Sequence, residues 1–244
     1  MTNKIAVVSG ASSGIGRSIT ELLLKNGYRV YGISKDKSDL VHPNFAPIQI
    51  DLRESESYNK IASGISEAKI HILVNNAGVA FELNGLDFTV DKFNSIFDIN
   101  FKAPILLTQA LKEKIRGGIV INISSVSDRL VGEGYALYCS SKAAFSKYFE
   151  AVALEEKNIK FITFLPSYVD TPLLRKLQDG RDFAWQDIVK PEQVAEFAFS
   201  AISNATLKSG AKVIIVSNSL KEDFEYNEDL WGYNADIKNL FRLG

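Results

Sequence analysis

The sequence predicts an α/β fold in which about seven parallel strands form a doubly wound sheet with helices on both faces. Three observations predict it. Short apolar runs rich in Val and Ile recur along the chain, and segments with helical spacing of apolar residues lie between them. Several of these runs lack polar alternation, which is expected of parallel strands that are covered on both faces. A glycine-rich turn joins the first run to the first helical segment.

The expected elements follow in chain order. Strands are predicted at Ile5–Val8, Val30–Ile33, Ile48–Ile50, Ile70–Val74, Ile119–Ile123, Phe161–Leu165 and Val213–Val216. Helices are predicted between them, at Ile15–Lys25, Glu54–Ser66, Val90–Ile115, Tyr135–Lys157 and Pro191–Ile202. The last helix begins with a proline followed by a glutamate, which is a favourable start. No internal repeat, low-complexity tract or linker interrupts the pattern, so residues 1–244 are expected to form a single domain.

Composition limits the functional classes. With 244 residues, of which 46% are hydrophobic, the chain can bury one large core. Its net charge of -1 gives no general attraction to nucleic acid or anionic membranes. The only cysteine, Cys139, excludes an intrachain disulfide, and two distant histidines offer no metal-ligand cluster. No apolar run matches a signal peptide or a membrane span, so a soluble cytoplasmic protein is expected.

The turn after the first expected strand reads Ser9-Gly10-Ala11-Ser12-Ser13-Gly14-Ile15-Gly16. Glycines there permit a tight turn and a close approach of the backbone to a phosphate. The helix that follows would offer free N–H groups and a positive dipole end to that anion, and the serine hydroxyls would add hydrogen bonds. The alternative is a turn that is tight for packing alone.

A second candidate site is the pair Tyr138 and Lys142, four residues apart in the expected helix from Tyr135. At this spacing the two side chains share one helical face. A phenol titrates near ~10, and a neighbouring ammonium is expected to lower its pKa. Such a tyrosine can exchange a proton with a substrate oxygen. The alternative is a surface tyrosine lying over a lysine stem.

Together, the Gly-x-x-x-Gly-x-Gly turn and the Tyr/Lys pair resemble the short-chain dehydrogenase/reductase family in its ordinary, Rossmann-like form. Other motifs match the family in order: Asp51-Leu52, Asn75-Asn76-Ala77-Gly78, Asp98-Ile99-Asn100-Phe101, and Ser124-Ser125 at the end of the fifth expected strand. Ser125 precedes Tyr138 by thirteen residues, a spacing usual in the family. The resemblance runs from the first strand to Val216, nearly the whole chain.

The resemblance implies hydride transfer between a nicotinamide and a carbonyl/alcohol pair. Tyr138 would be the general acid or base, and Lys142 would lower its pKa and bond the nicotinamide ribose. Ser125 would polarise the substrate oxygen, with Ser124 as a rival, and Asn100 would hold a water next to Lys142. For Asn100 the alternative is an amide that satisfies a helix backbone.

The resemblance also implies a single dinucleotide-binding and catalytic domain. It places the cofactor against Gly10, Ser12, Ser13, Gly14, Ile15, Gly16, Ser34, Lys35, Asp51, Leu52, Asn76, Ala77, Gly78, Tyr138, Lys142, Val169 and Thr171. NADP(H) is favoured, because Ser34 replaces the acidic residue typical of NAD(H) binding and Lys35 can pair with a 2′-phosphate. NAD(H) stays open, because Ser13 stands where many NADP-preferring relatives carry a basic residue. Lys35 is alternatively a solvated loop lysine.

Two segments stand out from the regular alternation of strands and helices. Residues 173–190 are expected to form a substrate lid, whose apolar wall suits a hydrophobic carbonyl or alcohol: Leu173, Leu174, Leu177, Phe183 and Trp185. The alternative is a hairpin that packs on its own domain. The aromatic tail at 218–244 would pack on a neighbouring subunit or border the pocket. The family also implies a homodimer or homotetramer.

Two rival functions of other kinds remain at this point. One is a nucleotide-sensing Rossmann protein without turnover, against which the complete set Asn100, Ser125, Tyr138 and Lys142 argues. The other is a nucleotide-sugar epimerase or dehydratase, which normally needs a longer chain with a separate substrate domain. An NAD-dependent dehydrogenase of the same family is a third, nearer alternative.

Overall fold

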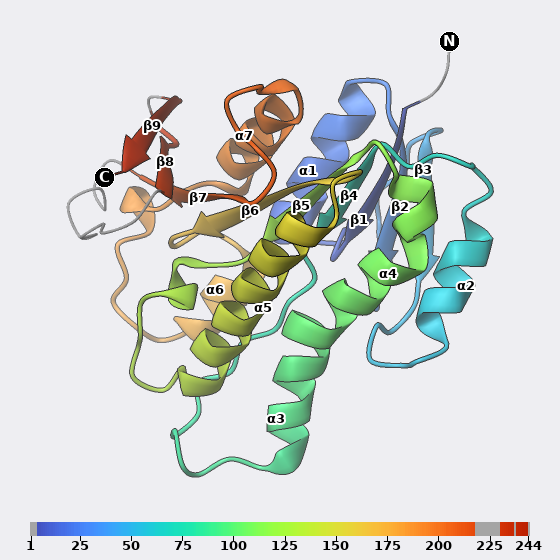
Figure 1. The fold of residues 1–244 in the computed structure, drawn as a ribbon. Coiled ribbons are helices and arrows are strands. Elements are labelled where there is room, and N and C mark those ends of the chain that lie inside the picture. The colour runs from blue at the N-terminus through green and yellow to red at the C-terminus, as the bar shows by residue number, and fades with distance from the viewer. Residues whose placement is uncertain (1–3, 218–229, 237, 244) are drawn as a thin grey trace.

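A computed structural model describes residues 4–217, 230–236 and 238–243 (Figure 1). Its strands are Ile5–Ser9 (β1), Arg29–Ser34 (β2), Phe45–Gln49 (β3), Ile72–Asn75 (β4), Ile119–Ile123 (β5), Lys160–Pro166 (β6), Ala211–Val216 (β7), Leu230–Asn234 (β8) and Asn239–Leu243 (β9). Its helices are Gly14–Lys25 (α1), Ser57–Gly64 (α2), Val90–Phe97 (α3), Ala103–Ile115 (α4), Ala136–Glu155 (α5), Pro172–Leu177 (α6) and Pro191–Ser203 (α7). Short π and 3-10 turns lie at Asp98–Lys102, Val126–Asp128 and Trp185–Asp187.

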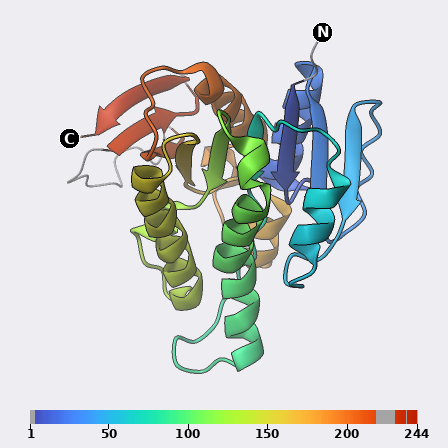
Figure 2. The same ribbon diagram turned by 45° about the vertical axis from the view of Figure 1, so that its right-hand side comes forward.

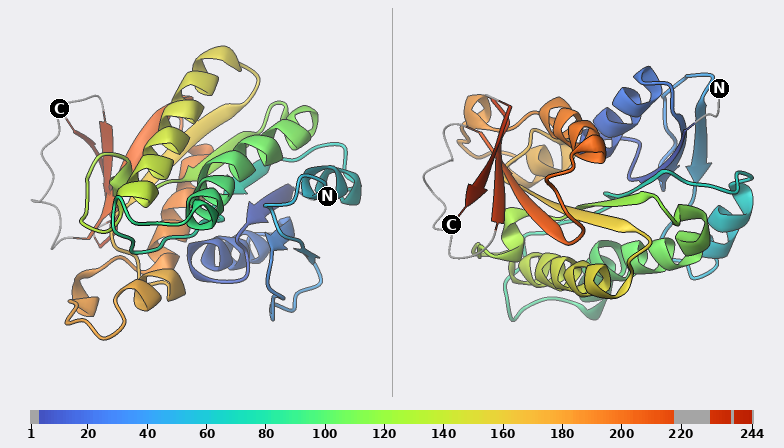
Figure 3. Two further views of the ribbon diagram at one scale, coloured as in Figure 1. Left: turned by 90° about the horizontal axis from the view of Figure 1, so that it is seen from below. Right: turned by 45° about the horizontal axis from the view of Figure 1, so that its top comes forward.

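The strands form one sheet in the order β3-β2-β1-β4-β5-β6-β7-β8-β9, with every neighbouring pair parallel except β8 and β9. Helices α1 and α7 cover one face, and α2, α4 and α5 cover the other (Figures 1 and 3). The predicted doubly wound α/β fold is confirmed. The strand order reverses between β1 and β4: strands on one side of this point run back to β3, and those on the other run on to β9. In such sheets, ligands bind at this reversal point.

Strand β1 shows why the apolar runs predict central strands. All five residues of Ile5–Ser9 are buried, because both faces of the sheet are covered. Ala6 and Val8 point into the core beneath α1 and α7. Ile5 and Val7 point into the core beneath α2, α4 and α5. A strand buried on both faces needs apolar residues at consecutive positions, which explains the missing alternation.

Strand β3 lies earlier than predicted, at Phe45–Gln49 instead of Ile48–Ile50. It contains Pro47, which a central strand would not tolerate because proline has no N–H to donate. β3 is the edge strand beside β2, and Pro47 is exposed there. The strand can therefore contain Pro47, because β3 lies at the edge of the sheet, and it begins before the predicted bounds.

The predicted strand number of about seven is too low, because the tail adds β8 and β9 to the sheet beyond β7. The Tyr233 ring stacks on Phe197 of α7 with centroids 4.0 Å apart, and Ala235 N–H donates to the Val216 carbonyl. The described part of the tail thus extends the sheet, an outcome that neither expectation for it included. Residues 218–229 of that tail lie outside the described residues.

The long predicted helix at Val90–Ile115 is a compound element. Helix α3 projects away from the body of the molecule (Figure 2), and a π turn at Asp98–Lys102 joins it to α4. In the described part of the chain, no helix is long and apolar enough to cross a membrane. The same residues contain no group of three or more His, Cys, Asp or Glu side chains placed to hold a metal ion.

Candidate active site

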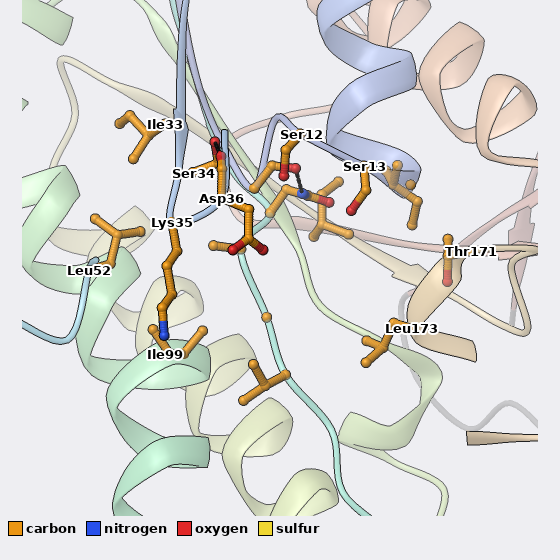
Figure 4. Close-up of a pocket in the computed structure, with 18 of the residues that line it drawn as sticks. Ser12, Ser13, Ile33, Ser34, Lys35, Asp36, Leu52, Ile99, Thr171 and Leu173 are labelled. Atoms are coloured by element: carbon orange, nitrogen blue, oxygen red, sulfur yellow. Dashed lines mark hydrogen bonds between the residues drawn. The ribbon is translucent and has the colours of Figure 1, made fainter. Parts of the chain in front are cut away.

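A cleft of 490 Å³ opens at the carboxyl ends of the central strands (Figure 4). Fifteen residues expected at the cofactor or in catalysis line it: Gly10, Ser12, Ser13, Gly14, Ile15, Ser34, Lys35, Asp51, Leu52, Asn76, Ala77, Gly78, Tyr138, Lys142 and Thr171. They come from segments far apart in the chain, which the parallel sheet brings to one edge. Gly16, Asn100, Ser125 and Val169 were also expected at the site, and they do not line the cleft.

The first turn has the geometry of an anion cradle. Gly10 and Gly14 have φ angles of +69° and +54°, which favour glycine. The N-cap residue of α1, Ser13, makes no side-chain capping hydrogen bond, and the first turn of the helix holds no acidic residue. The N–H groups at this helix start are therefore not capped by a side chain, and the positive end of the helix dipole is not neutralised there. The residues fit a pyrophosphate group.

Gly16 serves the packing of this turn. A Cβ on Gly16 would lie 2.3 Å from the Gly10 carbonyl oxygen and 2.4 Å from Asn76 Nδ2. Asn76 Nδ2 donates to the carbonyls of Ser9 and Gly10 at 3.0 and 3.2 Å. Ser9 Oγ in turn accepts from the backbone N–H groups of Asn76 and Ala77. The glycine-rich turn and the Asn-Asn-Ala-Gly loop are thus joined into one wall of the cleft.

Tyr138 and Lys142 lie four residues apart on α5, and both line the cleft. The Tyr138 hydroxyl is hydrogen-bonded to the Ser125 side chain. Only 6% of Lys142 is exposed, and its Nζ donates to the Ile123 carbonyl at 3.1 Å. Nζ lies 5.9 Å from the centre of the Tyr138 ring. The structure therefore brings a hydroxyl pair and a buried ammonium together at one end of the cleft.

The expected lowering of the tyrosine pKa is wrong for this structure. Burial raises the pKa of Tyr138 to about 12, although the hydrogen bond with Ser125 works in the opposite direction. Burial also lowers the pKa of Lys142 to about 8, while the negative charge of Asp128 opposes that shift. Desolvation of the charged form is the largest cause of both shifts. Near neutral pH, Tyr138 therefore carries its proton, which is the form that donates one.

The two serines at the end of β5 have different surroundings. Ser124 is buried, and its Oγ lies 2.8 Å from Ser146 Oγ. Ser125 is partly exposed, accepts from the Ser127 N–H at 3.1 Å and bonds Tyr138. Ser124 is thus occupied by contacts within the fold, and the hydroxyl beside Tyr138 belongs to Ser125.

Asn100 lies in the π turn and is 2% exposed. Its Oδ1 accepts from Val79 N–H at 2.8 Å, and its Nδ2 donates to the Val79 carbonyl at 2.9 Å and to Ser141 Oγ at 3.0 Å. A Cβ on Gly78 would lie 3.4 Å from Asn100 Oδ1 and 3.7 Å from Lys142 Nζ. Asn100 therefore fixes the Asn-Ala-Gly loop against α5, next to Lys142. Its amide bonds a loop backbone, not the helix backbone of the alternative interpretation.

The end of β2 carries charges of both signs (Figure 4). Ser34 Oγ donates to the Asp36 carbonyl at 2.7 Å, and the Lys35 side chain extends toward Ile99. Lys35 Nζ lies 3.5 Å from Asp51 Oδ2, and Arg53 forms a second ion pair with the same carboxylate. The Arg53 guanidinium holds the pKa of Asp51 well below its ordinary value. Asp51 therefore stays ionised and holds both cations beside the cleft.

Comparison with known proteins identifies the family. The sequence model of the family described as short chain dehydrogenase matches residues 4–182. The NAD-dependent glycerol dehydrogenase of Listeria innocua serovar 6a is 30% identical over 238 residues, which cover 88% of this chain and 93% of that protein. The chain belongs to the short-chain dehydrogenase family. It is therefore an oxidoreductase that acts on CH–OH and C=O groups, as the sequence predicts.

Other short-chain dehydrogenases agree with this. Carbonyl reductase (NADPH) 2 of Sus scrofa is 29% identical over 190 residues, covering 73% of this chain and 77% of that protein. A crystal structure of a short-chain dehydrogenase family protein from Francisella tularensis has the same fold, with a TM-score of 0.81 at 22% identity. It covers 87% of this chain and 97% of that one.

In this short-chain dehydrogenase, the segment after β6 forms a compact structure beside the cleft. Val169 is buried and pairs with Val189, so the two ends of the segment are joined. Thr171 lines the cleft, but its Oγ1 accepts from Leu174 N–H at 3.2 Å as the N-cap of α6. The Thr171 hydroxyl oxygen therefore accepts within the chain while its O–H is left to donate, and Val169 does not line the cleft.

The expected apolar wall is only partly turned to the cleft. Leu173 lines it, whereas Phe183 packs between Tyr168 and Trp185, with centroids 5.3 and 4.9 Å apart. This cluster agrees with the alternative interpretation, a hairpin that packs on its own domain, as far as Phe183 and Trp185 are concerned. Arg181 forms an ion pair with Glu82 across a second, open hollow of 830 Å³. The surroundings of this segment thus combine an apolar residue with charged ones.

Sequence reasoning missed several residues that line the cleft: Ile33, Asp36, Ile50, Arg53, Val79, Phe81, Ser95, Ile99, Ile123 and Pro172. Asp36 and Arg53 adjoin motifs that the sequence marks, so adjacency to Lys35 and Asp51 was the signal for them. The apolar residues Ile33, Ile50 and Val79 likewise adjoin residues expected at the site, whereas Phe81 and Ser95 adjoin none. Ile99 reaches the cleft from the π turn, which the helical periodicity does not reveal.

Proposed function

We propose that this protein is an NADP(H)-dependent oxidoreductase that interconverts a carbonyl and an alcohol, with Tyr138 as general acid and base. The observation that carries the proposal is the hydrogen bond between Tyr138 and Ser125 beside the buried Lys142, at one end of a cleft whose other wall is the uncapped start of α1. A dinucleotide lying along this cleft would have its pyrophosphate at the helix start and its nicotinamide beside Tyr138.

Each side chain then has a role in the reaction. A nicotinamide, when bound, supplies or accepts the hydride. Ser125 donates a hydrogen bond to the substrate oxygen, and Tyr138 gives that oxygen its proton as negative charge develops on it. Lys142 holds the ribose and stabilises the phenolate that remains. Asn100 holds the Gly78 loop beside Lys142, so that the ammonium keeps its place.

The proposed preference for NADP(H) rests on the end of β2. Ser34 brings no negative charge, and Lys35 and Arg53 bring two positive ones beside Asp51. Relatives are named both for NAD and for NADPH, so the family supports either cofactor. The carboxylate of Asp36 also lines the cleft and would favour NAD(H) if it met the ribose hydroxyls.

Replacing Lys35 by Ala tests this preference. We expect the variant to lose about ten- to a hundredfold in kcat/KM for NADPH and to change little for NADH, because only NADPH has a 2′-phosphate to pair with. Ser34→Asp should reverse the preference by repelling the phosphate. Lys37→Ala, at another exposed lysine of the same loop, is the control. Wild type that prefers NADH, or equal losses for both cofactors, would contradict the assignment.

The substrate class proposed here is a small carbonyl or alcohol compound with an apolar part against Leu173. The charged pair of Glu82 and Arg181 lies in the neighbouring hollow, where a polar group of the substrate would be accommodated. Residues 173–190 would form the lid over it. A panel of ketones, diketones, sugars and 3-oxoacyl thioesters, assayed by NADPH oxidation, tests the activity. Tight NADPH binding without turnover of any member would instead favour a nucleotide-sensing protein.

We also propose that the protein forms a homodimer or homotetramer through the side of α3, α4 and α5. Phe93 is exposed there and stacks on Phe97 with centroids 4.6 Å apart, and exposed Tyr148 lies 6.1 Å from Phe101. Exposed aromatic clusters of this kind are typical of interfaces.

Light scattering at micromolar concentration is expected to give a dimer or tetramer mass for wild type. Phe93→Glu should shift the mass toward the monomer, because a carboxylate would be buried at the contact. Val41→Glu, at an exposed apolar residue elsewhere, should leave the mass unchanged. A monomeric wild type would refute the proposed assembly.

A further inference from the structure

An aromatic side chain that the proposed mechanism does not use lines the active-site cleft. Phe81 lies in the loop that follows β4, and its side chain is half-buried in the cleft wall. An aromatic ring buries a large apolar area when a ligand packs on it, so a phenylalanine in this position offers a strong contact to a bound molecule. Leu173, from the segment after β6, is a second apolar side chain in the wall of the same cleft.

Two hydrogen bonds fix the loop on either side of Phe81. Two residues before it, Val79 N–H donates to Asn100 Oδ1 at 2.8 Å. Two residues after it, Leu83 N–H donates to the Gly134 carbonyl, also at 2.8 Å. Gly134 lies directly before the N-cap residue of α5. The chain at Phe81 therefore spans from Asn100 to the start of the helix that carries the proposed general acid, so its side chain meets the cleft at the substrate end.

The neighbouring Glu82 adds a further support to this loop. Its side chain packs on Gly134, where a Cβ would lie 2.8 Å from Glu82 Cγ. Gly134 also has a φ angle of +81°, so glycine suits this position both for its conformation and for the room that it leaves. The Glu82 carboxylate forms the ion pair with Arg181 of the segment after β6. The backbone around Phe81 is thus held on both sides, and the ring belongs to a fixed wall.

The ring itself is held by a cation from α3. Lys92 Nζ lies 4.0 Å from the centre of the Phe81 ring, well within the range of a cation–π contact. The Lys92 backbone is in turn fixed by the helix cap, because its N–H donates to Thr89 Oγ1 at 3.3 Å. Lys92 does not itself line the cleft, so the ammonium covers a part of the ring that is turned away from it. The cleft therefore meets an uncharged aromatic surface of fixed orientation.

We propose that Phe81 is a specificity-determining residue: the group that the substrate carries next to its carbonyl packs on this ring, and an uncharged aryl group fits it best. The proposal rests on the function proposed above. Two aromatic rings in offset or edge-to-face contact gain more than their buried area alone provides. A charged group would instead lose its hydration against the ring without a hydrogen bond in return. Leu173 adds a further apolar contact from the segment after β6.

The test compares the reduction of acetophenone with that of butan-2-one, a ketone without a ring. We expect Phe81→Ala to lower kcat/KM for acetophenone about tenfold, mainly by raising KM, and to change the value for butan-2-one by less than about threefold, because only the aryl ketone loses a stacking partner. Lys92→Met keeps the stem and removes the charge that holds the ring, so it should lower the acetophenone value about two- to fivefold. Leu86→Ala, at a 98% exposed residue of the same loop that does not line the cleft, is the matched control.

Binding measurements keep this test separate from the proposed activity. The alcohols 1-phenylethanol and butan-2-ol are titrated by NMR into the complex of the protein with oxidised cofactor. Even if neither ketone is reduced, 1-phenylethanol should bind wild type about tenfold more tightly than Phe81→Ala, and the dissociation constant of NADPH should be the same for both proteins. Aryl binding that depends on Phe81 without any turnover would count against the proposed function alone.

Three results would overturn the proposal. One is that 1-phenylethanol does not bind wild type. The second is that Phe81→Ala changes the aryl and alkyl compounds equally, or changes neither. The third is a loss of NADPH affinity in Phe81→Ala, which would show that the ring contacts the cofactor instead of the substrate.

Discussion

Tyr138→Phe is expected to lower kcat by about a thousandfold, within the range that one general acid contributes. The substitution removes the hydroxyl, which bonds Ser125 and carries the only proton that the proposed mechanism gives to the substrate oxygen. Because the pKa of Tyr138 is raised to about 12, the wild-type hydroxyl is protonated throughout the usual assay range. The reduction rate of wild type should therefore show no titration of this group near neutral pH.

The fold and NADPH affinity of Tyr138→Phe should be nearly those of wild type, because the ring remains. Steady-state rates and a fluorescence titration with NADPH measure both quantities. Tyr148→Phe is a suitable control, since Tyr148 is an exposed tyrosine on the same helix. Retention of activity within tenfold of wild type would show that Tyr138 is not the general acid.

Lys142→Ala is expected to lower kcat/KM by about a hundredfold or more and to weaken NADPH binding about tenfold. The ammonium is proposed to stabilise the phenolate and to hold the ribose, so chemistry and affinity should both suffer. In the oxidation direction, raising the pH should restore part of the rate, because hydroxide then removes the phenol proton without the ammonium.

The same two assays measure this variant, and Lys147→Ala is its control, because Lys147 is an exposed lysine on the same helix. A dissociation constant for NADPH equal to that of wild type would contradict the ribose role. Loss of affinity without loss of rate would contradict the role in proton transfer.

How much the sequence predicts depends on what each element needs. The central strands are apolar at successive positions because both faces are covered, and this pattern is visible without a structure. β8 is different, because Leu230–Asn234 contains a glycine and an asparagine and is not a continuous run of apolar residues. Its stability comes from pairing with β7 and from the Tyr233–Phe197 stack, which are contacts between distant residues. β3 was misplaced for a similar reason, since its proline is acceptable only at a sheet edge.

The site shows the same division. The glycine turn and the Tyr138–Lys142 pair are local motifs whose spacing follows from helix geometry, and the structure brings them to one cleft. The direction of the Tyr138 pKa shift could not be predicted from spacing, because its largest cause is burial, which depends on the folded structure.

The most direct test of the central claim is transfer of deuterium from NADPH labelled at C4 of the nicotinamide. Each enantiotopic label should be incubated with the enzyme and the panel of carbonyl compounds, and the alcohol products analysed by mass spectrometry. The proposed function predicts one deuterium on the carbinol carbon from one of the two labels with wild type, and at most a trace with Tyr138→Phe. NADPH binding without deuterium in any product, or equal transfer by wild type and Tyr138→Phe, would contradict it.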